Sequence, residues 1–396
     1  MSTDEFEDAI VEELTEPETE GRGVTIDDFV AYMPMHSYIF TPCREVWVGA
    51  SVNARLPRMP LLDKHGRPMR NDNGKPITIS ATRWLDQNRP VEHERPEVTN
   101  FNLYRPPRLE LGEAAQAEPW LNHVNCVYSE EDAKHIVCWL AHRVQRPAEK
   151  INHALVLGGA QGIGKDTLLE PVKYAVGPWN FQDISPTHLL GRFNGFVKSV
   201  ILRISEARDL GDVDRFSFYD RTKIYTAAPP DVLRVDEKNL REYYVFNCLG
   251  PVITTNHKTD GIYLPADDRR HYVAWSQRTK EEFSPEYWNK LWAWYGSGGI
   301  GHVAAYLAEL DLTDFDAKAP PPKTAAFWDI VNAARRRRVG RRARTPRQSG
   351  GSDAGPDNRA GHCHRDRGCG MADGAEEPAR NSAPHGALRL YAGAQS

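Results

Sequence analysis

The chain has 396 residues, of which 40% are hydrophobic and ten are tryptophan, and its formal net charge is −4. This length predicts two or three domains, and the apolar fraction is sufficient for a substantial core. The sequence contains no run of eighteen apolar residues, and its first residues are acidic. Both features argue against a membrane span and a signal peptide, so we expect a cytoplasmic protein without a membrane partner.

The two ends of the chain carry opposite charges. Residues 4–20 include nine Asp or Glu and no Lys or Arg, whereas residues 335–347 include eight Arg. We expect residues 1–23 to be a disordered acidic arm and residues 333–396 to be a disordered basic tail, because neither segment has enough apolar residues to offset chain entropy. The tail is either a nucleic-acid-binding extension or the product of a shifted reading frame near residue 334. We favour the frameshift, because the helical pattern that begins at Phe327 is cut in mid-pattern.

The six cysteines form no CxxC pair, which is typical of reduced thiols in a cytosolic protein. The nearest approach to a metal-binding cluster is His362, Cys363 and His364 with Cys369. It lies in a segment with almost no apolar residues, so we expect no zinc site there.

Residues 24–150 are predicted to form a mixed α+β accessory region. Short apolar runs at 38–40 and 46–48 favour strands, and turn residues dominate 63–74. The region ends in a predicted helix, for which Ser129 and Asp132 form a capping box.

Residues 151–332 are predicted to form an α/β domain. Continuous apolar runs at 154–157, 197–204, 252–255 and 271–275 favour buried strands, and their spacing favours a mainly parallel sheet. The aromatic stripe at 287–295 is predicted to be a helix packed on the core.

A phosphate-binding loop follows the first of these strands. Residues 159–165 fit the pattern GxxxxGK, directly after a strand and directly before a helical run. Glycines let successive backbone N–H groups converge on phosphate oxygens, the helix N-terminus adds positive charge, and the lysine reaches the β- and γ-phosphates. The sequence therefore predicts an ATP site formed by Gly159, Gly162, Gly164, Lys165, Asp166 and Thr167.

The expected Mg²⁺ ligands depart from the usual pattern. Asp166 stands where a Ser or Thr normally coordinates the metal, so either Thr167 or Asp166 is predicted to hold it. The second strand ends in Ser205 and Glu206, and a carboxylate at that place can contact the metal and activate the attacking water. Glu206 is alternatively an edge carboxylate in a local salt bridge.

Three further polar residues lie next to predicted strands. Asn256 ends the third strand and is either a residue that orients water at the γ-phosphate or a turn-forming Asn. Arg269 and Arg270 precede the fourth strand; they are either a solvated charge run or the source of an arginine finger for a neighbouring subunit.

The order of these motifs resembles superfamily 3 helicases, which are ring-forming ATPases of viruses, phages and plasmids. A closer similarity is to the helicase-like domain of phage and prophage primase-polymerase proteins, a domain-of-unknown-function family with a sheet similar to AAA+ proteins. The similarity spans roughly residues 36–332 and rests on the runs FNLYRPP, LAHRVQRPAEKINHALVL, GGAQGIGKDTLLEPV, ISEARDLGDVDRF, AAPPDVLRVDEKN and ITTNHKTDGIYLPADDRRHYVAW.

The resemblance implies roles for individual residues. Glu206 is the Walker B carboxylate, with Ser205 where many helicases have a second acid, and Asn256 is the sensor. Arg269 or Arg270 is the finger. A hairpin that carries Arg234 and Lys238 projects toward DNA, and Lys238 contacts the phosphates of one strand unless Glu237 or Asp236 pairs with it.

We therefore expect an ATP- and Mg²⁺-dependent helicase-like motor on single-stranded or forked DNA, assembled as a homo-oligomeric ring such as a hexamer. We expect the protein to act in the cytoplasm of a bacterial host or of a phage-infected cell. No acidic pair in the N-terminal region suits priming chemistry, which favours a separate primase or polymerase partner. A segment before residue 101 is short relative to the family, as in a decaying prophage gene. The alternatives are a small-molecule P-loop kinase and a non-hydrolysing nucleotide-binding scaffold.

Overall fold

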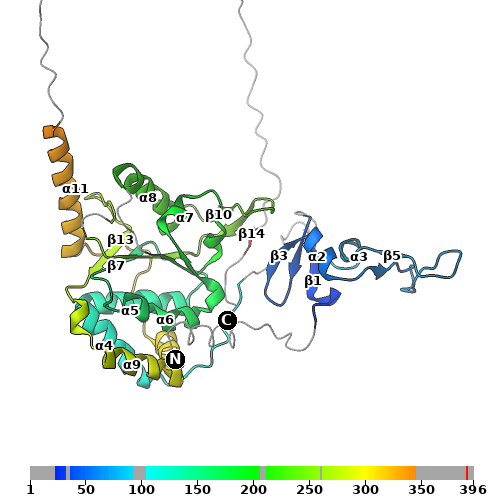
Figure 1. The fold of residues 1–396 in the computed structure, drawn as a ribbon, viewed down its shortest axis with the longest axis horizontal. Coiled ribbons are helices and arrows are strands. Elements are labelled where there is room, and N and C mark those ends of the chain that lie inside the picture. Colours follow the sequence, from blue (N-terminus) through cyan, green and yellow to red (C-terminus); the bar gives the residue numbers. More distant parts are fainter. Residues whose placement is uncertain are drawn as a thin grey trace, which may run out of the picture.

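The protein is described by a computed structural model that covers residues 23–32, 36–91, 104–205, 211–258, 261–344 and 389–390. Figure 1 shows a small N-terminal unit beside a larger α/β unit. The predicted acidic arm lies almost entirely outside the described residues, as does the predicted tail beyond residue 344 apart from a two-residue strand.

A five-stranded parallel sheet forms the centre of the larger unit. Its order is β13 (His271–Trp275), β7 (Ala154–Gly158), β12 (Gly250–Thr255), β9 (Ile201–Ile204) and β8 (Phe181–Ile184). Every neighbouring pair in this sheet is parallel. The prediction of an α/β fold with a parallel sheet is confirmed. The predicted strand at 197–204 is shorter than expected, because Gly195–Lys198 form a 3-10 turn before β9 begins.

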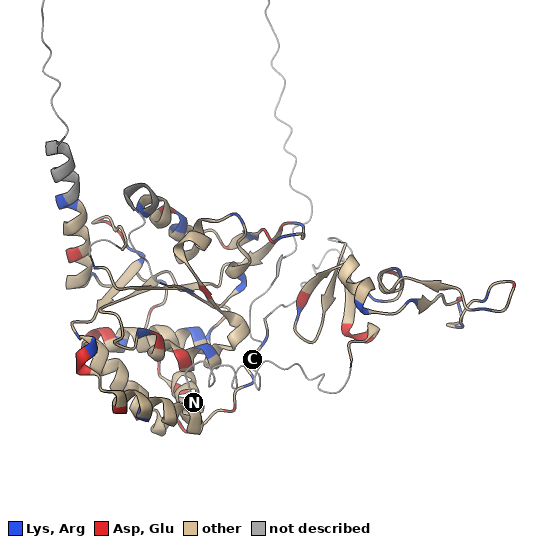
Figure 2. Ribbon diagram, viewed as in Figure 1, with Lys and Arg blue, Asp and Glu red and all other residues tan. Residues whose placement is uncertain are grey.

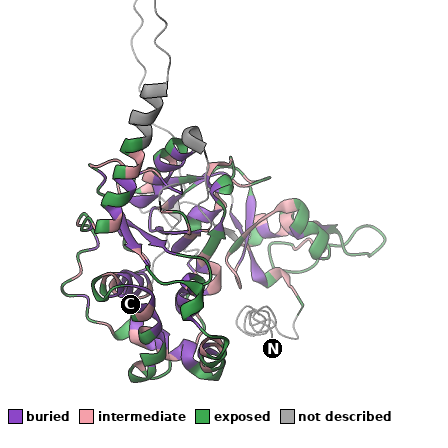
Figure 3. Ribbon diagram, turned by 60° about the vertical axis from the view of Figure 1, so that its left-hand side comes forward, coloured by how far each residue is buried: buried purple, intermediate pink, exposed green. Residues whose placement is uncertain are grey.

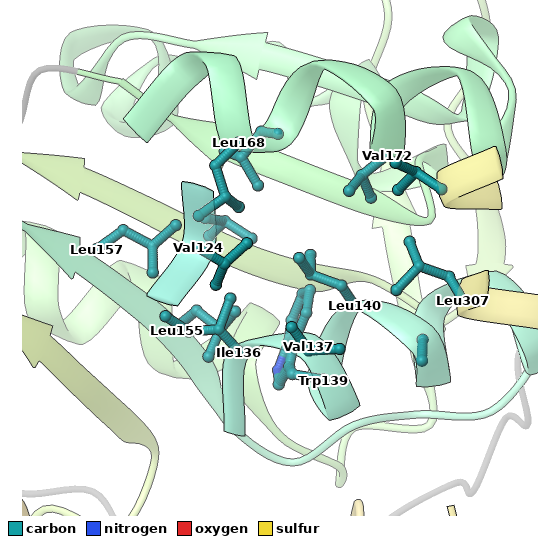
Figure 4. Packing of buried hydrophobic residues seen from close by; sticks show 14 of the residues in the cluster. Val124, Ile136, Val137, Trp139, Leu140, Leu155, Leu157, Leu168, Val172 and Leu307 are labelled. Carbon is teal, nitrogen blue, oxygen red and sulfur yellow. The ribbon is translucent and has the colours of Figure 1, made fainter. Parts of the chain in front are cut away.

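The sheet is buried on both faces, and its side chains alternate between two hydrophobic clusters. On β7, Leu155 and Leu157 belong to one cluster and Val156 belongs to the other. This alternation follows from the two-residue period of a strand, and it explains why these strands read as continuous apolar runs. Figure 4 shows the first cluster, where helix residues such as Ile136 and Leu140 pack against β7.

Helices cover both faces of the sheet (Figures 1 and 3). Those with residues in the first cluster are α4 (Glu118–Val127), α5 (Glu130–Gln145), α6 (Lys165–Val176), α9 (Pro285–Trp294) and α10 (Ile300–Glu309). The chain between α9 and α10 is kinked at Ser297 and Gly298. The second cluster takes residues from α7 (Pro186–Leu190), α8 (Gly211–Thr226), α11 (Ala325–Arg344) and the antiparallel hairpin of β10 (Val232–Val235) and β11 (Tyr243–Phe246). Strand β14 (Arg389–Leu390) pairs with β11.

The N-terminal unit has its own small core. The sheet order is β3 (Glu45–Val48), β2 (Ser37–Phe40), β1 (Phe29–Tyr32) and β6 (Pro90–Val91), accompanied by α2 (Gly49–Arg55), α3 (Ala81–Asn88) and the two-stranded sheet of β4 (Met59–Pro60) and β5 (Thr78–Ile79). Phe29, Phe40 and Leu85 are buried between the sheet and the helices. The predicted strands at 38–40 and 46–48 are confirmed.

Two helices near the predicted domain boundaries, α5 and α11, pack on the central sheet. The helix capped by Ser129 forms as expected, with the Asp132 backbone N–H donating to the Ser129 hydroxyl over 3.2 Å. It packs on the central sheet, however, so residues from about 104 onward belong with the α/β unit. Helix α11 continues through residue 333 to Arg344, and Phe327, Ile330 and Val331 anchor its first turns in the second cluster.

Candidate functional site

The predicted phosphate loop connects the end of β7 to the start of α6. Gly159, Gly162 and Gly164 have φ angles of +146°, +80° and +87°, which residues with a Cβ rarely adopt. A Cβ on Gly164 would also lie 2.5 Å from the His123 ring and 2.6 Å from the Trp288 ring. The loop conformation and the close packing of α4 and α9 therefore both require glycine at position 164.

Lys165 lies at the centre of this loop with only 7% of its surface exposed. Its Nζ donates to the carbonyl oxygens of Gly159 and Ala160, over 2.9 Å and 2.8 Å, and to Asn256 Oδ1 over 2.7 Å. Burial lowers the pKa of the Lys165 ammonium from 10.5 to about 8, although the charge of Asp166 acts in the opposite direction. The structure thus brings together Lys165 and Asn256, which the sequence analysis had selected independently.

Three buried or half-buried side chains hold the loop and the first turn of α6 in place. The Trp120 indole donates to the Leu168 carbonyl over 2.9 Å, and the Tyr295 hydroxyl donates to the Thr167 carbonyl over 3.0 Å. His123 Nε2 lies 3.0 Å from the Gly164 carbonyl, and its Nδ1 lies 2.7 Å from the Tyr287 hydroxyl. Burial lowers the pKa of His123, so the ring is neutral, with its proton on Nε2 toward the carbonyl.

Arg203 is a site residue that the sequence analysis missed. On β9 it shares the strand face of Ile201, and its guanidinium lies 3.1 Å from Asp166 Oδ1 and 3.3 Å from Asp183 Oδ2. The available signal was the period-two alternation, because an arginine inside an apolar strand must face a charged group. Asp166, which replaces the usual Ser or Thr, is thus paired with Arg203.

A cavity of about 510 Å³ lies at this edge of the sheet. Its wall includes loop residues, the ends of β9 and β12, and two tryptophans of α9: Gln161, Gly162, Gly164, Lys165, Asp166, Thr167, Arg203, Ser205, Thr254, Thr255, Asn256, Lys280, Trp288 and Trp292. Thr167 and Asp166 both reach it, so the choice between them as metal ligand stays open. Glu206 lies outside the described residues, and its predicted role stays a prediction.

Arg269 and Arg270 lie at the opposite edge of the sheet. The Arg270 carbonyl accepts from the N–H of Ala154, the first residue of β7, whereas the phosphate loop follows the last residue of β7. A five-residue strand separates the two edges by about 16 Å. Neither arginine therefore reaches the phosphate loop of its own chain. Arg269 is exposed and Arg270 is half-buried.

The predicted hairpin is present, with Val235 opposite Tyr243. The two acids that might have paired with Lys238 have other partners: Glu237 lies 2.7 Å from Lys198, and Asp236 lies 3.2 Å from Arg192. Lys238 is exposed at the turn and has no ion-pair partner among the described residues.

The remaining side chain of the predicted DNA-binding pair, Arg234, is bound to Glu242 over 3.0 Å. Figure 2 shows charged residues of both signs along this hairpin. Lys238 also lines a second cavity of about 770 Å³ between the two units.

The described part of the chain contains no cluster of three His, Cys, Asp or Glu side chains arranged for a metal ion. The His362, Cys363, His364 and Cys369 cluster lies outside it. Among the helices of that same part, none combines the length and the apolar character needed to cross a membrane.

Comparison with known proteins gives a family match and several similar solved structures. Residues 157–270 match the family model described as a family of unknown function (DUF5906). No curated protein matches the chain. The apo structure of the NrS-1 C-terminal region (305–718) is similar at a TM-score of 0.56 and 16% identity, over 77% of this chain and 71% of that one.

A second apo structure of the NrS-1 C-terminal region, its A form, gives a TM-score of 0.52, again at 16% identity. The X-ray structure of JCV helicase gives only 0.31 at 12% identity, over 58% of this chain and 61% of that one, which is too low to support a shared fold. The likeness to the NrS-1 region therefore shows that the chain shares an α/β fold, with a P-loop NTPase-like core, with that protein.

Proposed function

We propose that the chain is a helicase-like motor of the superfamily 3 type, which hydrolyses ATP with Mg²⁺ and acts on DNA. The observation that carries this proposal is the position of Lys165. Its ammonium lies in the glycine loop at the carboxyl ends of the parallel strands, 2.7 Å from the amide oxygen of Asn256, beside a cavity of about 510 Å³. Ligands of open α/β sheets bind at this edge.

The residues present fit a triphosphate. Three loop glycines have positive φ, and the partners of the nearly buried ammonium among the described residues are carbonyl and amide oxygens. These oxygens are weaker partners than a phosphate would be, because charge-assisted bonds between two ions are stronger. Lys165 would therefore leave them and bind the phosphates when ATP enters.

The oxygen ligands available to Mg²⁺ are the Thr167 hydroxyl and the Asp166 carboxylate, which are the hard ligands that this ion prefers. When bound, the ion would neutralise charge that develops on the phosphates. Arg203 would supply a second positive charge from β9 and hold Asp166 in position. The Asn256 amide would then no longer bind Lys165 and would instead form a hydrogen bond to the water that attacks the γ-phosphate.

A ring would complete the site. Since Arg269 and Arg270 lie at the opposite edge of the sheet, a finger formed by them serves a neighbouring subunit, and the exposure of Arg269 favours that residue. The same geometry disfavours a small-molecule kinase, in which lid arginines must reach the phosphates of their own chain. The exposed Lys238 at the hairpin turn has no ion-pair partner among the described residues, which supports contact with DNA phosphates.

The test measures ATP hydrolysis by the full chain with and without single-stranded DNA. We expect stimulation by DNA and loss of turnover in Lys165→Ala. The matched control is Lys173→Ala, because Lys173 lies on the same helix but pairs with Glu170 at 3.5 Å. Equal hydrolysis with and without DNA would contradict the motor. ATP binding without turnover would support the non-hydrolysing scaffold instead, and a mass measurement with ATP and DNA present would test the ring.

A further inference from the structure

Two tryptophans of α9 form an aromatic wall beside the phosphate loop. Trp288 and Trp292 are one helical turn apart, both are half-buried, and both line the cavity that contains Lys165. The tryptophans of the core differ, because Trp120 and Trp139 are fully buried. The predicted packing of this stripe on the core is present, with Leu291 and Tyr295 buried, and its two half-buried tryptophans also line the cavity.

The wall has a fixed position relative to the loop. Trp288 packs edge-on against Tyr287 and His123, with ring centroids 5.1 Å and 5.6 Å away, and His123 in turn binds the Gly164 carbonyl. Trp292 packs edge-on against Tyr295, with ring centroids 5.5 Å apart, and the Tyr295 hydroxyl donates a hydrogen bond to the Thr167 carbonyl. Both indoles are thus connected through one aromatic neighbour to the backbone turn that would hold the phosphates.

We infer that Trp288 and Trp292 form the base-binding wall of the nucleotide pocket, on which the base of a purine nucleoside triphosphate stacks. This inference rests on the proposed nucleotide site. Phosphates held by Lys165 and the first turn of α6 leave the sugar and the base to extend past that turn, where the aromatic wall lies. A half-buried indole in a cavity offers an apolar π-surface to a flat, poorly hydrated ring.

Stacking of this kind has a predictable magnitude and selectivity. A base on an aromatic side chain contributes about 1–3 kcal/mol, which corresponds to about 5- to 150-fold in affinity. Purines have the larger ring area and stack more strongly than pyrimidines. We therefore expect ATP and GTP to bind similarly to each other, and CTP and UTP to bind more weakly.

The experiment compares ATP with inorganic tripolyphosphate, which has the phosphates but no base. Titrations of the full chain are followed by calorimetry, and ATP is also followed by quenching of tryptophan fluorescence. Variants are Trp288→Leu and Trp292→Leu, which keep apolar volume but remove the π-surface. Trp294→Leu is the matched control, because Trp294 is a half-buried residue of the same helix that packs on Tyr295 and His302 outside the cavity.

We expect wild type to bind ATP about 5- to 150-fold more tightly than tripolyphosphate. Both cavity variants should lose most of this ratio while tripolyphosphate affinity, which reports an intact loop, stays unchanged, and Trp294→Leu should keep the ratio. If wild type binds tripolyphosphate tightly and ATP equally tightly, the base-binding role of the two tryptophans is wrong but the phosphate site stands. The same conclusion follows if the ratio of ATP affinity to tripolyphosphate affinity is unchanged in both cavity variants. Failure of wild type to bind either ligand overturns the proposed nucleotide site as well.

Discussion

The affinity for ATP is expected to fall as the pH rises above 8, because the Lys165 ammonium loses its proton in that range. Burial lowers its pKa from 10.5 to about 8, and its partners in the free protein are neutral oxygens. A bound triphosphate places several negative charges beside Nζ and returns the pKa toward its ordinary value. Binding above pH 8 is therefore coupled to proton uptake.

The magnitude follows from the two pKa values. With a pKa of about 8 in the free protein and about 10.5 in the complex, affinity falls about 30-fold between pH 7 and pH 9.5, or about 2 kcal/mol. The stability of the free protein changes in the opposite direction. Because the unfolded lysine keeps its proton up to about pH 10.5, the unfolded state binds more protons between the two values, and this residue's destabilising effect diminishes as pH rises.

The assay is a calorimetric titration of ATP at constant ionic strength from pH 7 to pH 9.5. Lys165→Arg is the control, because a guanidinium stays protonated throughout this range, so its affinity, though weaker, should not vary with pH. Chemical denaturation of the free wild type and of Lys165→Met over the same pH range tests the predicted pH dependence of the free energy of unfolding. A wild-type affinity independent of pH, or an equal fall in Lys165→Arg, would refute the assignment of this titration to Lys165.

Three further predictions concern the loop, the hairpin and the core. Gly164→Ala should lower ATP affinity at least tenfold, because an alanine at this positive φ costs about 1–2 kcal/mol and its Cβ would contact two aromatic rings. The control is Gly66→Ala, at φ +75° with no atoms near the added Cβ. It should lower the melting temperature but leave the ATP affinity measured by titration unchanged. Lys238→Ala should reduce the slope of log affinity against log salt for single-stranded DNA by about 1 and leave DNA-free ATP hydrolysis unchanged; an unaltered slope would exclude a phosphate contact. Arg143→Met should lower the free energy of unfolding in urea by about 1–3 kcal/mol, because the buried guanidinium donates to the carbonyls of Cys248 and Arg146, over 2.7 Å and 2.8 Å. Arg146→Met, half-exposed, should cost less than about 1 kcal/mol, and equal losses would contradict the role of burial.

Features that depend on local spacing along the chain could be predicted from the sequence. Largely apolar runs located β7, β12 and β13, since a strand buried on both faces has few polar positions. Glycines and a lysine at fixed intervals between a strand and a helix located the phosphate loop, because φ angles and helix termini are local properties. The hairpin around Lys238 was expected from the resemblance to helicase-like proteins.

Which of these elements contact one another could not be predicted, because it depends on the three-dimensional fold. Helix α5 was predicted correctly as a helix but assigned to the accessory region, because a helical period does not reveal which sheet it covers. Arg203 enters the phosphate site because β9 lies beside β8 and faces α6, and this strand order is not encoded in local spacing.

The aromatic stripe of α9 shows the same limit. Its period predicted a helix with one apolar face, which formed, but Trp288 and Trp292 reach the cavity because α9 packs against His123 of α4, which contacts the phosphate loop. Likewise, chain order placed Arg269 and Arg270 next to a strand, and only the parallel direction of β13 and β7 put them at the edge opposite the phosphate loop. Spacing along a chain fixes what each element is, whereas contacts between distant residues depend on how the elements are ordered and oriented in space.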